Sequence, residues 1–433
     1  MDDVEHKRAI RAWTMYDWAN STFATTIAAA VLPVYYSTVA SKNLQPHEAT
    51  SNWAFTTTIA LVMVALLGPI LGAMADFSGT KKRFMTIFVI LGVSGTALLY
   101  LVKSGDWLMA SVFYIIGSIG FAGANVFYDS LLPHIAHPDE IDQVSSRGYA
   151  MGYAGGGILL AINLAMIMLS PDHLTEIMTR ISFLTVSVWW LVFTIPFWRN
   201  VKEPPRRIFA AEAGINPVKA SISRLATTFK EIRKYKELTK FIGAFWLYNN
   251  GIGTIIFMAT IYGTELGFSS TTTIGTLLMV QFVAIPFAFL FGWLAKKIGT
   301  KRSILLSIFI YTLIAIAGYF LYKEIHFWLL GFGVATVQGG SQALSRSLCG
   351  RMMPKSKSAE FFSFFSVSEK IAGTVGPLLF GVVSRLMGGS RLSIVSLIIF
   401  FFLGGLLLWQ VKEKDGIAIA EAEEELLIAS NIA

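Results

Sequence analysis

An aspartate stands inside the first apolar stretch of the chain, RAWTMYDWANSTFATTIAAAVLPVYY, which runs from Arg11 to Tyr36. Its polar residues recur at i, i+3, i+4 and i+8, the spacing of one helix face, and they are Asp17, Asn20, Ser21 and Thr25. An ionisable group within a bilayer costs several kcal/mol unless it is paired or wetted. The stripe therefore predicts a cavity in which a polar solute binds or a proton is exchanged.

A second polar stripe has the same helical spacing far along the chain, and its members are Gln338, Ser341, Gln342, Ser345 and Arg346. An arginine and a carboxylate on facing helices can close a gate by forming an ion pair. For Asp17 the expected partner is Arg346 or Arg147, and Asp129 is a further candidate for such a gate.

Glu369 and Lys370 form the ionisable pair nearest the middle of an apolar segment, roughly nine residues or about 14 Å from its end. Sequence neighbours point about 100° apart on a helix, so each needs another partner. We expect a solute-binding or proton-coupling role, with a purely structural pair as the alternative. Asp17 could instead cap the interface beside Trp13, and Asp129 and Arg147 could lie at headgroup level.

The composition identifies the elements that must position these residues. Of 433 residues, 54% are hydrophobic and 14% are charged, and the mean hydropathy is +0.60. Runs of about 20 apolar residues, each long enough to cross a bilayer as a helix, predict an all-α membrane protein with twelve transmembrane helices. The expected segments are 13–39, 52–75, 84–102, 107–133, 148–169, 181–198, 241–262, 273–295, 303–322, 326–349, 361–386 and 392–411.

Lys and Arg are unevenly distributed between alternate loops. One alternate set of loops contains few basic residues, which are Lys42, Lys103, Arg180, Lys323, Arg385 and Arg391. The positive-inside rule then predicts that both termini are cytoplasmic. The net charge of +8 follows from this topology, so nucleic-acid binding is not needed to explain it.

One long polar stretch divides the chain. It predicts an N-terminal six-helix half at 1–198, a cytoplasmic linker with an amphipathic helix at 199–240, a C-terminal half at 241–411 and an acidic tail at 412–433.

The two halves also share a repeated sequence pattern. GAMADFSGTKKR from residue 72 aligns with GWLAKKIGTKRS from residue 292, and in the first helices Asp17 falls opposite Asn249. Two six-helix halves of the same orientation are a parallel repeat.

The loop GAMADFSGTKKR resembles the signature of the major facilitator superfamily, in which it belongs to the inner gate. The resemblance implies that fold and a set of gate residues, which are Gly72, Asp76, Gly79, Lys81 and Lys82. This sequence departs from the signature at Phe77, where a basic residue is usual. In the second copy Lys296 stands where Asp is usual.

Further stretches resemble a narrower group, the unknown major facilitator family. They are YDWANSTFATT, FYDSLLPHIA, SSRGYAMGYAGGG, LYNNGIGTI, QGGSQALSRSL and FFSFFSVSEKIAGTVGPLLFG. That family comprises bacterial relatives of the fungal vacuolar effluxers linked to autophagy. The resemblance implies that the polar stripes face a central cavity, and that amino acids are a candidate solute, as they are for the fungal relatives.

Together these features predict a secondary active transporter that moves a small polar solute, such as an amino acid or a short peptide, by alternating access and with possible proton coupling. A sugar or drug-like efflux transporter and a transport-dead receptor are the alternatives. The sequence has no GxxxxGK[ST] phosphate loop and no HExxH motif, and Cys349 is its single cysteine. We therefore expect no enzyme activity, no cofactor and no metal. The expected setting is the bacterial inner membrane, where the chain would be a monomer.

Overall fold

The computed structural model describes residues 3–205, 234–387 and 390–430, and throughout these ranges the regular structure is helical. The first group of helices comprises α1 (Asp3–Thr22), η1 (Phe23–Ala30), α2 (Val31–Tyr35), η2 (Tyr36–Ala40), α3 (Pro46–Ser78), α4 (Lys81–Leu98), η3 (Leu99–Leu101), α5 (Trp107–Ile135), α6 (Ile141–Met168), η4 (Asp172–Leu174) and α7 (Thr175–Asn200). The second group comprises α9 (Lys236–Glu265), α10 (Ser270–Ile298), α11 (Thr300–Tyr319), α12 (Glu324–Arg351), η6 (Lys355–Lys357), α13 (Ser358–Met387), α14 (Arg391–Ser396) and α15 (Ile398–Gln410).

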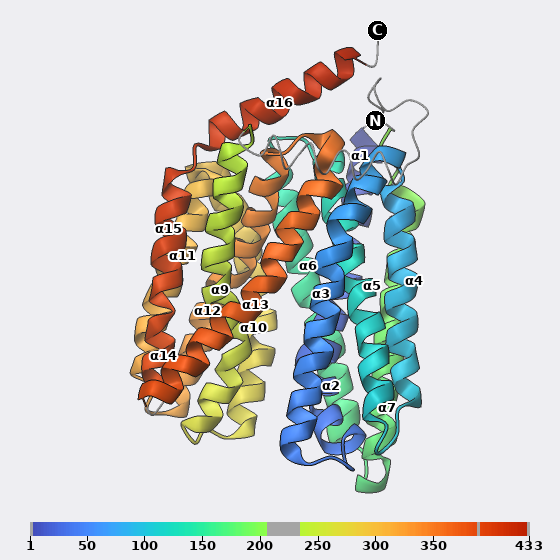
Figure 1. Ribbon diagram of the computed structural model, residues 1–433, viewed down its shortest axis with the longest axis vertical. Coiled ribbons are helices and arrows are strands. Elements are labelled where there is room, and N and C mark those ends of the chain that lie inside the picture. Colours follow the sequence, from blue (N-terminus) through green and yellow to red (C-terminus); the bar gives the residue numbers. More distant parts are fainter. Residues whose placement is uncertain (1–2, 206–233, 388–389, 431–433) are drawn as a thin grey trace.

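Ten of the helices in these ranges are long and apolar enough to cross a membrane. Helices α12 and α13 are not among these ten, but both run within the bundle (Figure 1). The polar stripe of α12 makes that helix less apolar than the others. With these two, the bundle has the twelve helices that the sequence predicts, and the fold-class prediction of an all-α membrane protein is confirmed.

The two groups lie side by side, and each has its own hydrophobic core (Figure 1). Trp13 and Trp190 are fully buried in the first core, and Tyr248 and Tyr311 are buried in the second. The described parts nearest both termini lie at one end of the bundle, which we call the terminal end, and α16 (Glu413–Ser430) runs across it. Most of the expected linker helix, at 206–233, falls outside the described residues.

The first helix is longer and less regular than expected. It begins at Asp3, ten residues before the predicted start, because the polar N-terminal residues continue the helix beyond the apolar segment. Two stretches of π-helix, η1 and η2, interrupt its other half. π-Helical turns widen a helix locally and are frequent at functional sites.

Two glycines end corresponding helices of the repeat. Gly79 caps α3 at φ 64° and Gly299 caps α10 at φ 92°, a region of φ that other residues rarely adopt. These are the glycines that align in the two loop sequences, so the repeat extends to the backbone of the turns.

Candidate functional site

Arg346 of α12 joins the two groups of helices at the terminal end. Its Nη1 and Nη2 atoms both lie 3.2 Å from Asp17 Oδ2 of α1, and Nη1 lies 3.1 Å from Asp129 Oδ1 of α5. Its Nε donates to Ser145 Oγ at 2.9 Å and its Nη2 donates to the Ser145 carbonyl at 2.9 Å. We call Arg346, Asp17, Asp129 and Ser145 the Arg346 lock.

The lock is shielded from water by aromatic rings. The guanidinium carbon of Arg346 lies 4.4 Å from the ring centre of Tyr149, 4.8 Å from that of Trp13 and 5.5 Å from that of Tyr128. The Tyr128 hydroxyl also donates to Asp17 Oδ2 at 2.8 Å. The Arg346 side chain is only 4% exposed, and charge pairs are screened little at such depth.

A glycine of α6 makes room for the lock. A Cβ atom on Gly148 would lie 2.4 Å from Asp17 Oδ2 and 2.8 Å from Arg346 Nη2. Farther along α6, a Cβ atom on Gly152 or Gly155 would meet Ser21 or Trp18 of α1. The glycine-rich stretch therefore serves close packing of α6 against α1.

A second junction lies between α3 and α13. Asp76 Oδ2 accepts from the backbone N–H of Glu360 at 2.8 Å, and Oδ1 accepts from that of Ala359 at 3.2 Å. These donors belong to the first turn of α13, where a carboxylate is stabilised by unpaired N–H groups and the helix dipole. Lys81 pairs with Asp76 at 2.7 Å and donates to Ser358 Oγ at 2.5 Å. A Cβ atom on Gly72 would lie 2.5 Å from the Ala359 carbonyl oxygen, so the helices approach closely there.

The other loop of the repeat makes a corresponding junction with α6. Thr300 Oγ1 donates to Asp142 Oδ2 at 2.6 Å, and Arg351 Nη2 lies 3.5 Å from the same oxygen. A Cβ atom on Gly292 would lie 2.9 Å from that of Ser146. Lys296 replaces the usual loop aspartate and is exposed, and Asp142 of the opposite group supplies a carboxylate instead. Sequence reasoning missed Asp142, because only the fold brings it to this loop.

Two predicted residues lie away from these junctions. Arg147 is exposed and takes no part in the described lock. Lys82 donates to the carbonyls of Trp198 and Val201, so it binds the end of α7 in its own group. The side chain of Lys370 lies outside the described residues.

The other predicted residues lie deeper in the bundle. The Asn20 amide donates to Asn125 Oδ1 at 2.5 Å, and the Gln342 side chain accepts from the Tyr153 hydroxyl at 3.1 Å. Asn249 is buried and Glu369 is partly buried. These residues lie on helices of both groups and bring amide and carboxyl chemistry toward the middle of the bundle.

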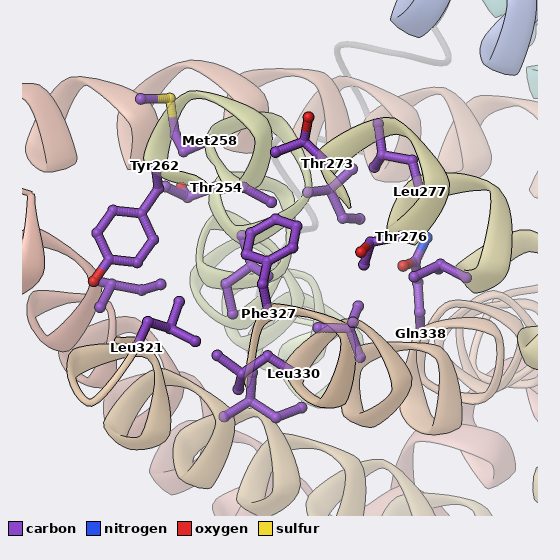
Figure 2. Close-up of a pocket in the computed structure, with 18 of the residues that line it drawn as sticks. Thr254, Met258, Tyr262, Thr273, Thr276, Leu277, Leu321, Phe327, Leu330 and Gln338 are labelled. Carbon is purple, nitrogen blue, oxygen red and sulfur yellow. The ribbon is translucent and has the colours of Figure 1, made fainter. Parts of the chain in front are cut away.

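A mostly apolar pocket lies within the second group (Figure 2). Tyr262 and Leu321 line one side, while Gln338 and Thr276 bring polar atoms to the other. Its walls come from α9 to α14 and from Leu397, so this pocket does not lie between the two groups.

Helix α16 braces the segment that precedes α13. Glu423 Oε1 lies 2.7 Å from Lys357 Nζ and accepts from the Tyr235 hydroxyl at 2.5 Å. Glu424 Oε2 accepts from the backbone N–H of Ser356 at 3.0 Å. Burial acts to raise the pKa of Glu423, but hydrogen bonds from Lys357, Tyr235 and Lys234 outweigh it, so the pKa is lowered.

The lowered pKa of Glu423 predicts a pH dependence for the docking of α16. Its contribution is complete above the ordinary carboxyl pKa of about 4.3 and is lost as the pH falls through the lowered value. At neutral pH, Glu423→Gln mimics the protonated state. Because Gln keeps the size of Glu423 and one acceptor oxygen but loses the charge, we expect a cost of about 1 kcal/mol and roughly fivefold faster amide exchange in α16. The exposed Glu421→Gln is the control, and equal exchange in both variants would refute this role.

The fold defines the class of protein. The structure is similar to that of the proton:xylose symporter XylE of the major facilitator superfamily, with a TM-score of 0.73 and 14% identity over 98% of this chain and 99% of that one. It is also similar to FucP in its outward conformation, with a TM-score of 0.68 and 13% identity over 94% and 98%. This likeness shows the major facilitator fold, and the predicted fold is confirmed.

The sequence comparisons then give the family. The pattern of the family described as Vacuole effluxer Atg22 like matches residues 45–421. The chain is 37% identical to the uncharacterized MFS-type transporter YxiO of Bacillus subtilis, over 96% of this chain and 97% of YxiO. It is 23% identical to autophagy-related protein 22 of Kluyveromyces lactis, over 91% of each. The chain therefore belongs to the Atg22-like family. Its relatives are transporters rather than enzymes, as predicted.

Proposed function

We propose that this chain is a secondary active transporter that moves an amino acid or a short peptide by alternating access, and that the Arg346 lock is its gate at the terminal end. The observation that carries the proposal is the buried junction of Arg346 with Asp17 and Asp129, which joins the two groups. An ion pair that closes one end of a two-group bundle can break when the groups rock about the site between them.

The position of the contacts supports alternating access. The hydrogen bonds and ion pairs described between the groups all lie toward the terminal end, from Asp76 and Asp142 to Tyr153 and Gln342. Lys and Arg are concentrated in the loops at this end, which favours a cytoplasmic position for it. On that orientation, the described state is closed toward the cytoplasm.

The polar groups of the bundle suit a zwitterionic solute. Carboxylates, amides and a guanidinium come from both groups, so they can hold an ammonium and a carboxylate at once. The family is described as a vacuole effluxer family, and the names of the fungal relatives associate them with autophagy. Counterflow with a labelled amino-acid panel in proteoliposomes tests the substrate class. Exchange of at least one member is expected, whereas flux of sugars or drug-like solutes alone would favour the alternative transporter.

Charge balance supports proton coupling. One arginine faces two carboxylates in the lock, so a bound proton would neutralise the excess negative charge when the groups rearrange. Glu369, partly buried on α13, is a second candidate carrier.

Removing a proton carrier should remove the response to a pH gradient. We expect an imposed gradient to drive uptake several-fold above equilibrium exchange, and Glu369→Gln to abolish that stimulation while leaving counterflow intact. The exposed Glu176→Gln at the opposite end is the control. If transport is indifferent to the gradient in the unaltered protein, proton coupling is wrong. If the gradient stimulates Glu369→Gln as fully as it stimulates the unaltered protein, the proton carrier lies elsewhere, and Asp129 is the next residue to test.

Binding without transport would mark a receptor. Purified protein that binds a solute yet gives no counterflow in vesicles, with the lock intact, would favour that class. We also propose that the protein acts as a monomer. A bacterial cytoplasmic membrane is the proposed setting, which the likeness to the Bacillus subtilis protein supports.

A further inference from the structure

We propose that the terminal end of the first group carries a binding site for one divalent transition-metal ion, formed by His6, His137 and Glu140. Each residue offers one ligand atom, and these atoms all lie within 4.8 Å of one another. His6 Nε2 lies 2.5 Å from Glu140 Oε1, and the rings of His6 and His137 have their centres 4.4 Å apart. The site is separate from the Arg346 lock, and it does not depend on the proposed function.

The fold brings these ligands together from distant parts of the sequence. His6 lies on the part of α1 that extends beyond the apolar segment, and His137 and Glu140 lie in the turn between α5 and α6. His137 is exposed and Glu140 is partly exposed, so the site is open to water. An ion could therefore enter without opening the gate. Sequence reasoning predicted no metal, because only the tertiary fold places His6 beside the turn.

The donor set selects the chemical class of the ion. Two imidazoles and one carboxylate favour Zn²⁺, Co²⁺ or Ni²⁺ over Mg²⁺ and Ca²⁺, which prefer oxygen ligands alone. Metal bonds of about 2.0–2.2 Å in a tetrahedron separate ligand atoms by roughly 3.3–3.6 Å. Binding would then widen the His6–Glu140 contact and draw the most distant pair together. Small side-chain rotations supply that change, and water can occupy the fourth position.

A backbone hydrogen bond already orients the carboxylate. The N–H of His137 donates to Glu140 Oε1 at 2.9 Å, so that oxygen is held toward both histidines. Groups that fix the orientation of a ligand raise the affinity of metal sites. A bound ion would tie the start of α1 to the turn before α6, two helices that carry Asp17 and Ser145 of the lock.

The test uses full-length protein without a histidine tag, stripped with a chelator and titrated with Co²⁺ in detergent. We expect one Co²⁺ per chain, with the intense visible bands of tetrahedral coordination, displacement by Zn²⁺, and a rise in Tm on metal addition. His6→Ala, His137→Ala and Glu140→Gln should each lower the affinity at least tenfold. His173→Ala, an exposed histidine at the opposite end, should bind as the unaltered protein does.

Two results would overturn the site. One is the absence of a Co²⁺ spectrum or a Tm rise in the unaltered protein. The other is unchanged affinity in all three ligand variants. Because His137 is exposed, its replacement should leave the metal-free Tm unchanged, so lost binding there reports the ligand and not misfolding.

Discussion

Replacing Arg346 with alanine is expected to open the terminal end and to abolish concentrative transport. The variant leaves Asp17 and Asp129 facing each other in a buried site without their cation. Removing one partner of a buried ion pair costs about 3–5 kcal/mol. That cost applies only to the closed state, so the equilibrium between closed and open should shift by roughly 100-fold or more. Uptake into proteoliposomes under an imposed pH gradient measures the loss.

Two companion variants separate charge from geometry. Arg346→Lys keeps the charge but loses the planar donors that reach Asp17, Asp129 and Ser145 together, so an intermediate loss is expected. Arg147→Ala removes an exposed arginine of α6 and should transport normally. Equal loss in Arg147→Ala and Arg346→Ala would mean that general positive charge, and not the lock, supports transport.

The second large effect is expected at Gly72. A methyl group there would meet the Ala359 carbonyl oxygen at 2.5 Å, so α3 and α13 must separate. Separation lengthens the hydrogen bonds of Asp76 to the first turn of α13. Overpacking costs about 1–3 kcal/mol, so Gly72→Ala should lower transport by roughly 10-fold or more. Initial rates of counterflow at matched protein density provide the measurement.

Gly68 provides a matched control one turn earlier on α3. A Cβ atom there would lie 3.6 Å from Ser363 Cβ, an ordinary contact, so Gly68→Ala should transport normally. Gly292→Ala tests the other copy of the repeat, where the obstacle is the Ser146 side chain, and a milder loss is expected. Normal transport by Gly72→Ala would show that the α3–α13 junction does not need to close tightly.

The sequence predicted the helices well because each helix carries its own signal. The length of each apolar run and the repeated loop are local properties, and the glycines at 79 and 299 mark helix ends in both copies. The pairing of Asp17 with Arg346 also had a local basis, since both lie in helical stripes of polar residues. Whether those two residues serve a transport gate remains a prediction.

The choice between Arg346 and Arg147 could not be made from the sequence. Gly148 of α6 faces Asp17, and its neighbour Arg147 points about 100° away around the helix, where its side chain is exposed. If α6 were rotated about its axis by one residue position, Arg147 would face Asp17 in place of Gly148. The rotation of α6 therefore decides whether Arg147 or Arg346 pairs with Asp17. Helix rotation depends on tertiary packing, here on close contacts of Gly152 and Gly155 with α1.

The sequence also could not show how polar residues at corresponding positions differ between the two halves. Arg346 of the second half corresponds to Asn125 of the first at an offset of 221 residues, and Asp17 of the first half corresponds to Asn249 of the second at an offset of 232, so each member of the charged pair has an amide as its counterpart. Asp142 serves the loop in which Lys296 has replaced an acidic residue. Each replacement can be explained only from the folded structure, because the partner residue lies on the opposite group of helices.

The claim that the Arg346 lock closes the terminal end is tested most directly by distances between spin labels on the protein in nanodiscs. In a Cys349→Ala background, one pair at exposed positions 83 and 297 spans the terminal end, and a second pair at 42 and 323 spans the opposite end. The lock predicts a short terminal-end distance in the unaltered protein. In Arg346→Ala that distance should lengthen while the opposite pair shortens. Identical distributions for both proteins at both ends would contradict it.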